Sequence, residues 1–533
     1  MAGFCYSLYL PMKTTPPPST QPLPKSDIFI AALVWLAAFS LYVRTLAPSL
    51  LWGDMAEFQT LSYTLGMTHP SGYMTHVMIG KLFTLIPMGN IAWRVNLMSA
   101  FFGALAVANV YLITRLHGGW RAAGLSASAL LTLLEGFWWR ALIAESYAPA
   151  AGFLSSIWLF VLLWQRSQRW HYLFLAGLLG GLSIGIHSTV VMTAAAVLVY
   201  LAFTARTKSA WLGAATGALV GAALTVAAFL YLDHNDPPSG IYTTVYRPSL
   251  SLYGLTESQF DTPRERFFAI FPASHFWSYY FTAPTTEIQF RLGEYVSYFP
   301  AWAVALIVIG VGAVFVRSRW QDGLYPLIGF LLIWGLGVTV EFSIYREFYV
   351  PAAVFVAVWL GAGASAMLEG VDWLARKIPL RGSRMRALAV GVVSLGLVAL
   401  PLLNAREDLR LSIEKGYPSF VQQNHIYPIF APDKAIKDAT RLLNKIEPRG
   451  IVFADWDKLY SYVYTAEIVI GRKDVSLHEY LFMDDGSLPE TTLAYIEANI
   501  DSRPIYFTTM IEELNELYAV KQVGDSLYLI RRR

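Results

Sequence analysis

Long apolar segments dominate this sequence, and their length limits the folds that the chain can adopt. About eleven of them approach the length of a membrane-spanning helix, which needs roughly 20 apolar residues. They are residues 28–47, 95–116, 122–139, 147–165, 172–187, 189–204, 211–232, 298–316, 324–341, 350–368 and 387–404. Because 55% of all residues are hydrophobic and only 14% are charged, a soluble protein of this size is excluded. The sequence predicts a polytopic α-helical membrane protein with about eleven transmembrane helices.

Two further segments are expected outside the bilayer. Residues 74–88 are interrupted by His76 and Lys81, which is typical of a helix that lies in the membrane interface. Residues 1–27 are rich in proline and lack the apolar core of a cleaved signal peptide, so we expect a disordered cytoplasmic tail. The single cysteine, Cys5, excludes an internal disulfide and a cysteine-rich metal site.

Basic residues between the apolar segments predict how the chain crosses the membrane, since cytoplasmic loops are enriched in Lys and Arg. With the N-terminus in the cytoplasm, the inner loops contain basic residues that the short outer loops largely lack. These are Arg115, Arg121, Arg166, Arg169, Arg206, Lys208, Arg317, Arg319 and the basic run at residues 376–386. We therefore expect a multi-pass plasma-membrane protein whose C-terminal part lies outside the cytoplasm.

The outer side is expected to contain two loops and a separate domain. Residues 28–404 form the transmembrane domain, with outer loops at residues 47–94 and 233–297. A long, aromatic segment such as 233–297 is usually a lid or a binding element. Residues 405–533 predict a soluble α/β domain. Its expected strands lie in GIVFADW, DVSLHEY and RPIYFTTM, and YAVKQVGDSLYLIRR predicts a hairpin with a Gly-Asp turn.

An acidic motif follows directly on the first apolar segment, in LWGDMAEFQTLSYTLGMTHPSGY at residues 51–73. The i,i+3 spacing of Asp54 and Glu57 puts both carboxylates on one face of a helical turn, where like charges oppose full ionisation of both. One can then act as a base while the other shares a proton or a cation. The His69-Pro70 pair breaks the helix and the glycine that follows permits a turn. This pattern predicts an acidic pocket, although a helix N-cap with a solvated first-turn acid is the alternative.

Three more ionisable residues are candidates for the same site. Glu145 lies in an apolar stretch, where it is costly without a partner, and a pair with Arg140 would be a purely structural alternative. His187 stands alone between two apolar segments, either as a ligand or as a satisfied core residue. Arg346 offers bidentate recognition of phosphate, unless Glu347 neutralises it.

The motifs WGDMAEF, MTHPSGY, WRVNLMSAFFGALAV, AESYAP, GIHSTV and REFYVPA resemble, in this order, those of the protein O-mannosyltransferase-like membrane glycosyltransferases of the GT-C superfamily. The resemblance implies a GT-C-like fold and transfer of a sugar from a polyprenyl-phosphate carrier on the outer membrane face. It also implies a catalytic acid in the first outer loop. Carried over, Asp54 becomes the general base with Glu57 as its companion, and the substrate-binding candidates are His69, Tyr73, Glu145, His187 and Arg346.

The function expected from the resemblance is that of an inverting glycosyltransferase, with mannose as one possible sugar and a protein, lipid or glycan hydroxyl as acceptor. A net charge of +3 gives no reason to expect a nucleic-acid partner. Asp54, Glu57 and Glu145 can together hold a divalent cation, but an aspartate base with an arginine phosphate clamp needs none, so no obligatory metal or cofactor is expected.

Two alternatives from other classes compete with the enzyme. One is a lipid or sugar transporter or flippase, which would favour charged residues at the bilayer midplane and an inverted repeat. The other is a non-catalytic scaffold that binds the carrier lipid.

Overall fold

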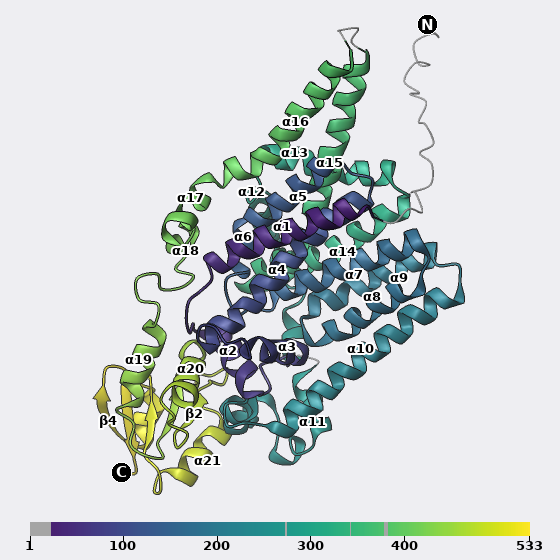
Figure 1. Cartoon of the computed structure of the whole chain (residues 1–533). Coiled ribbons are helices and arrows are strands. Elements are labelled where there is room, and N and C mark those ends of the chain that lie inside the picture. Colours follow the sequence, from purple (N-terminus) through teal and green to yellow (C-terminus); the bar gives the residue numbers. More distant parts are fainter. Residues whose placement is uncertain (1–22, 272–273, 342, 378–381) are drawn as a thin grey trace.

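Helices make up most of the computed structural model, which describes residues 23–271, 274–341, 343–377 and 382–533 (Figure 1). Within this described part, seven helices are long and apolar enough to cross a membrane. They are α1 (Lys25–Arg44), α4 (Ile91–Leu116), α7 (Tyr147–Ser167), α10 (Lys208–Asn235), α14 (Trp320–Thr339), α15 (Tyr349–Lys377) and α16 (Gly382–Asn404). An eighth results if α12 (Thr285–Ser297) and α13 (Ala301–Arg317), which are bent by 104°, form one broken span. The expected cytoplasmic tail lies outside the described residues, apart from its last five.

The expected count of about eleven spans is too high by this measure, because three apolar segments form shorter helices. They are α5 (Arg121–Leu133), which is followed by the short α6 (Glu135–Arg140), then α8 (Trp170–Leu182) and α9 (Ser188–Thr204). Each interruption has a local cause. The backbone at Leu134 is extended between α5 and α6, and α8 passes into the 3-10 turn η1 (Ser183–Gly185) before His187 extends the chain again. Hydropathy places a boundary between apolar segments at His187 but none at Leu134.

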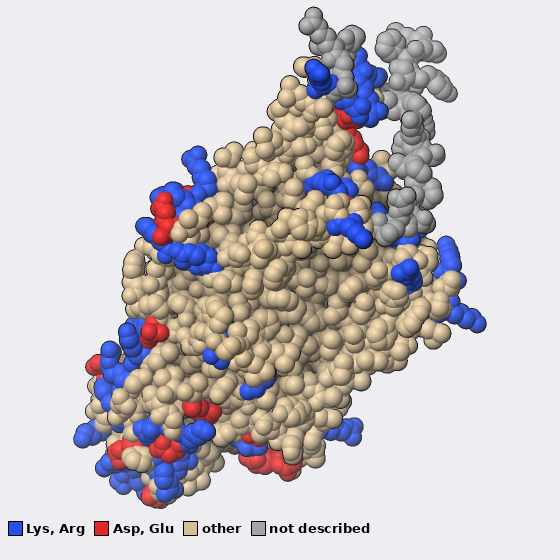
Figure 2. Space-filling view, in the orientation of Figure 1, with Lys and Arg blue, Asp and Glu red and all other residues tan. Residues whose placement is uncertain are grey.

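The centre of the bundle consists of α4, α7 and α15, whose residues are mostly buried, whereas α1, α10 and α16 expose their apolar side chains. Figure 2 shows a wide band with few charges between the upper end of the molecule and the charged surface of the C-terminal domain. Near the upper end, Asp27 of α1 forms ion pairs with Arg115 and Arg121, at 3.2 and 2.8 Å, and so connects α1 to α4 and to the helix that begins at Arg121. This arrangement is that of a membrane protein whose lipid-facing helices surround a buried core.

The C-terminal part of the chain forms a small α/β domain around a five-stranded sheet. Its strands are β1 (Ile451–Ala454), β2 (Ser476–Glu479), β3 (Ile505–Phe507), β4 (Ala519–Gly524) and β5 (Leu527–Arg531), in the order β2-β1-β3-β5-β4. Strand β1 is parallel to β2 and β3, while β5 is antiparallel to β3 and β4. Its helical elements are α19 (Lys434–Leu443), α20 (Trp456–Tyr464), η7 (Thr465–Val469), α21 (Glu490–Asn499) and α22 (Glu512–Leu517). The helices α17 (Arg406–Lys415) and α18 (Ser419–Gln423) fall within the range expected for this domain but lie beside the bundle, where Phe420 packs on Trp138 (Figure 1). All the expected strands and the β4–β5 hairpin are confirmed.

The two outer loops fold into short helices that lie between the bundle and this domain (Figure 1). The first loop contains α2 (Gly53–Thr64) and α3 (Met74–Thr84). The second contains η2 (Tyr242–Tyr246), η3 (Arg247–Tyr253), η4 (Glu257–Gln259), α11 (Pro263–Ile270) and η5 (Ser274–Tyr279), and a further turn, η6 (Ser343–Phe348), precedes α15. The second loop is fixed to the C-terminal domain, because His478 Nδ1 lies 2.9 Å from the Thr243 carbonyl oxygen and the Thr244 and Tyr460 hydroxyls are 3.1 Å apart.

Candidate active site

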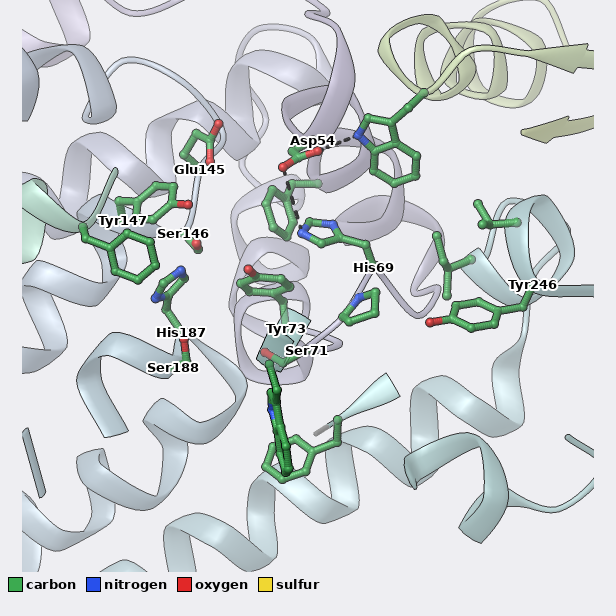
Figure 3. Close-up of a pocket in the computed structure, with 18 of the residues that line it drawn as sticks. Asp54, His69, Ser71, Tyr73, Glu145, Ser146, Tyr147, His187, Ser188 and Tyr246 are labelled. Atoms are coloured by element: carbon green, nitrogen blue, oxygen red, sulfur yellow. Dashed lines mark hydrogen bonds and ion pairs between the residues drawn. The ribbon is translucent and has the colours of Figure 1, made fainter. Parts of the chain in front are cut away.

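A cavity of about 590 Å³, here called the central cavity, lies where the bundle, the second outer loop and the C-terminal domain meet. Five of the residues singled out in the sequence line it together: Asp54, His69, Tyr73, Glu145 and His187 (Figure 3). They come from α2, from the turn between α2 and α3, from the loop before α7 and from the residue before α9. Positions far apart in the sequence thus form one site.

Asp54 and Glu57 both face His69, as their i,i+3 spacing predicts. The Glu57 carboxyl is fully buried; its Oε1 accepts the backbone N–H of His69 at 2.7 Å, and its Oε2 lies 2.5 Å from His69 Nδ1. Asp54 is about half exposed, and its Oδ2 lies 4.0 Å from His69 Nε2. Glu57 therefore positions the histidine, while Asp54 is the carboxylate that reaches the central cavity.

A tight turn brings His69 to this position. The Gly72 N–H donates to the His69 carbonyl oxygen at 2.7 Å, and Gly72 has a φ of +87°. That left-handed conformation favours glycine, and a Cβ atom there would lie within 3.2–3.3 Å of Ile270, Met67 and Met74. The turn predicted from the sequence is present, and it is closed by packing from the second outer loop.

The charges around His69 determine its protonation. Burial alone would lower its pKa, but the negative charges of Glu57 and Asp54 raise the pKa of His69 to about 9. At neutral pH the imidazolium is then shared by two carboxylates. From the sequence, one of the two acids was expected to share a proton or a cation. In the structure, Glu57 is that acid, and the cation is the protonated side chain of His69.

Glu145 lies on the same side of the cavity as Tyr147 and His187, opposite Tyr246 (Figure 3). Burial raises the pKa of Glu145 to about 8, although the nearby charge of Arg140 opposes this rise. The structural alternative required an ion pair between Arg140 and Glu145, and Arg140 does not form this pair. It forms its ion pair with Glu347 instead.

Arg346 does not join the other candidates, so the expectation that it belongs to the same pocket is corrected. It lines a second cavity of about 490 Å³, the side cavity, together with Arg140. Its guanidinium pairs with Glu294 at 2.6 Å, and not with Glu347. The tight turn η6 explains the difference, because it directs Phe348 into the central cavity and Arg346 into the side cavity.

Sequence reasoning missed the residues that the C-terminal domain and the second outer loop contribute. Trp456 lines the central cavity, and its indole N–H donates to Asp54 Oδ1 at 2.6 Å. Glu479, Tyr246 and Tyr253 also line the cavity. One signal was available: Trp456 follows β1 and Glu479 ends β2, and sites in open α/β sheets form at the carboxyl ends of parallel strands.

The central cavity is acidic. Its described lining residues include Asp54, Glu145 and Glu479 but neither Lys nor Arg. In the described part of the chain, no three His, Cys, Asp or Glu residues are grouped so that they could hold a metal ion. The acids near Asp54 are instead arranged around His69.

Comparison with known proteins supports the sequence resemblance over part of the chain. Residues 54–211 match the model of the family described as protein O-mannosyl-transferase TMEM260 N-terminal domain. The chain is 33% identical over 117 residues to the protein O-mannosyl-transferase TMEM260 of Mus musculus, covering 22% of this chain and 16% of the relative. It is 26% identical over 150 residues to the protein O-mannosyl-transferase tmem260 of Dictyostelium discoideum, covering 28% of this chain and 18% of the relative. The matched segment thus spans less than a fifth of either relative.

Structural similarity to known proteins extends over much more of the chain than the sequence similarity does. ArnT from Cupriavidus metallidurans in the apo state superposes with a TM-score of 0.54 at 14% identity, over 95% of this chain and 97% of that one. The structure of the same protein bound to undecaprenyl phosphate gives a TM-score of 0.53 at 14% identity, with the same coverage. The chain therefore combines a GT-C-like fold with a sequence similar to the TMEM260 protein O-mannosyl-transferases around its candidate active site.

Proposed function

We propose that this chain is a membrane glycosyltransferase that moves a sugar from a polyprenyl-phosphate carrier to a protein hydroxyl, with mannose as the first candidate sugar. One observation carries the proposal: Asp54 faces the central cavity, and the part of the cavity lining between Asp54 and Met192 lies within the segment similar to the protein O-mannosyl-transferases. The names of those relatives support a protein acceptor and mannose, and the complex of ArnT with undecaprenyl phosphate supports a polyprenyl carrier.

The proposed reaction is a single displacement at the anomeric carbon. The acceptor hydroxyl oxygen forms the new bond to that carbon, the bond to the phosphate oxygen breaks, and the hydroxyl proton passes to Asp54. Polyprenyl phosphate leaves, and the anomeric configuration inverts. Trp456 holds Oδ1 of Asp54, so Oδ2 is the oxygen placed to accept the proton.

An apolar groove of about 460 Å³ between α8, α9 and α10 suits the prenyl tail of the donor. It begins beside the central cavity, because α9 supplies Ser188 and Met192 to the cavity and Val190 and Val197 to the groove. Glycines keep α8 and α10 so close that a Cβ on Gly181 would collide with the α10 backbone. A lipid tail in this groove would leave its phosphate at the cavity mouth.

The donor phosphate needs a cation, and Arg140 is better placed than Arg346. Both arginines line the side cavity, but the charge of Arg140 also acts on Glu145 in the central cavity, whereas Arg346 is held by Glu294. Arg140 already pairs with Glu347, but a guanidinium has five N–H donors and can hold a carboxylate and a phosphate together, so we assign Arg140 to the phosphate.

The proposal also places the central cavity and the C-terminal domain outside the cytoplasm. The basic inner loops support this orientation, because several of them lie at the end of the bundle that is remote from the C-terminal domain (Figure 2). A sugar carried on a polyprenyl phosphate would then meet its acceptor on the outer membrane face.

Purified protein in liposomes, supplied with radiolabelled polyprenyl-phosphate mannose and a threonine-containing peptide mixture, tests the proposal. An enzyme transfers the label to the peptide. A flippase moves the labelled lipid between leaflets without transfer, and a scaffold binds it and does neither. Label that stays on the carrier in the presence of every peptide would refute the proposed function.

A further inference from the structure

The carboxyl edge of the C-terminal sheet forms one wall of the central cavity. Strands β1 and β2 are parallel, and their register places Ala454 beside Glu479. Trp456, two residues after β1 ends, and Glu479, the last residue of β2, both reach the cavity from this edge. Because short strands and α20 hold them, these side chains are presented by rigid elements and not by a free loop.

Among the described acids of the cavity, Glu479 shares with Glu145 the lack of a partner for its carboxyl, but it is the one that comes from the C-terminal domain. Its residue is only 8% exposed, and within the described residues its carboxyl forms no hydrogen bond or ion pair. Asp54, by contrast, accepts from Trp456, and Glu57 accepts from His69. A buried carboxyl without a partner is costly, whether neutral or charged, unless a ligand supplies a hydrogen-bond donor.

The surroundings of Glu479 indicate which ligand would supply that donor. Tyr246 and Tyr253, whose stacked rings are 4.6 Å apart, extend the same wall from the second outer loop. In Figure 3, Tyr246 lies on the side of the cavity opposite Glu145, Tyr147 and His187. The apolar groove approaches from α9, on the side of His187, so the carrier lipid and the acceptor would approach Asp54 from opposite sides.

This wall is also fixed in place. His478, next to Glu479, bridges the Thr243 carbonyl oxygen and the Tyr495 hydroxyl, at 2.9 and 3.0 Å. The Thr492 hydroxyl donates to the Pro248 carbonyl oxygen at 2.8 Å. The second outer loop and the C-terminal domain therefore form a single preorganised surface, as selective recognition of a ligand requires.

We propose that Glu479 binds the acceptor polypeptide, by accepting a hydrogen bond from an N–H or O–H group close to the hydroxyl that receives the sugar. This inference rests on the proposed glycosyltransferase function and adds to it a residue that determines acceptor affinity. The C-terminal domain then supplies the acceptor half of the site, and the membrane bundle supplies the donor half.

The test uses the full chain in liposomes, polyprenyl-phosphate mannose as donor, and an equimolar mixture of nonapeptides with a central threonine as acceptor. Glu479→Leu removes the acceptor oxygens at similar size, so the peptide KM should rise about ten-fold or more, while the donor KM stays within about two-fold of wild type. Glu479→Gln keeps one carbonyl oxygen and should recover part of the affinity. The control is Glu467→Leu, which alters a partly buried acid of the same domain that bonds to Ser239 and does not line the cavity.

Three results would overturn the inference while leaving the proposed function intact. They are an unchanged peptide KM in Glu479→Leu, a rise in donor KM in place of peptide KM, or an equal rise in the Glu467→Leu control. Absence of transfer by the wild-type protein to any peptide would instead refute the proposed function, and the inference with it.

Discussion

Replacing Glu57 by glutamine removes the buried charge that holds His69, while nearly preserving its shape. The carbonyl oxygen of the glutamine can still accept the backbone N–H of His69, which Glu57 accepts at 2.7 Å. The imidazole loses its anionic partner at 2.5 Å and keeps only Asp54, at 4.0 Å. We therefore expect the variant to fold but to lose most of the force that keeps His69 protonated.

The size of the effect follows from the pKa of His69, which Glu57 and Asp54 raise from 6.5 to about 9. At about 1.36 kcal/mol per pH unit, this net difference corresponds to roughly 3 kcal/mol, which the charges of Glu57 and Asp54 supply against the opposing effect of burial. The folded-state pKa lies above the unfolded one. The stabilisation is therefore complete below about pH 6.5 and is lost as the pH rises through about 9.

Thermal unfolding of the full chain in detergent, measured from pH 6 to pH 10, tests this reasoning. The stability gap between wild type and Glu57→Gln should be largest near pH 6 and should shrink steadily towards pH 10. His69→Gln is the matched control: it should remove the same pH dependence, and the double variant should lose little more than either single variant. A gap that is constant with pH, or that grows above pH 8, would refute the reasoning.

Three further predictions concern the neighbouring residues and the topology. Trp456→Phe removes the N–H that fixes Asp54, so turnover should fall about 10- to 100-fold with donor affinity unchanged in a binding assay; weakened donor binding with normal turnover would contradict this. Arg140→Gln should weaken binding of polyprenyl phosphate at least about ten-fold, whereas Arg346→Gln should change it about two-fold or less; the reverse order would restore Arg346 as the phosphate ligand. On a cysteine-free background, Asp485→Cys should react with an impermeant thiol reagent in sealed cells and Lys208→Cys should not, and labelling of both would overturn the orientation.

The sequence predicted the kind of fold well and the continuity of its helices less well. Hydropathy located the apolar segments because burial and lipid exposure both demand apolar side chains. It separated the segments on either side of His187 but did not reveal the break at Leu134, where the backbone is extended between α5 and α6. The strands of the C-terminal domain were predictable because their short apolar runs are bounded by turn residues.

The candidate site was predictable where its residues are close in sequence and not where the domains meet. Asp54 and Glu57 share a helical turn, so their spacing alone placed them together. Trp456 reaches Asp54 only because the C-terminal domain docks on α2, a contact between residues about 400 positions apart that no local pattern encodes. The error for Arg346 has a different, local origin, since a single tight turn decides which cavity a side chain enters.

The measurement that tests the central claim most directly is the single-turnover rate of sugar transfer by Asp54→Asn, with donor affinity measured on the same preparation. The substitution keeps the shape and an oxygen for Trp456 but removes the base. A general base contributes about 10²–10⁴-fold, so the rate should fall by that factor while donor affinity stays near wild type. A near wild-type rate in Asp54→Asn, together with an inactive Glu57→Gln or Glu145→Gln, would contradict the assignment of Asp54 as the base.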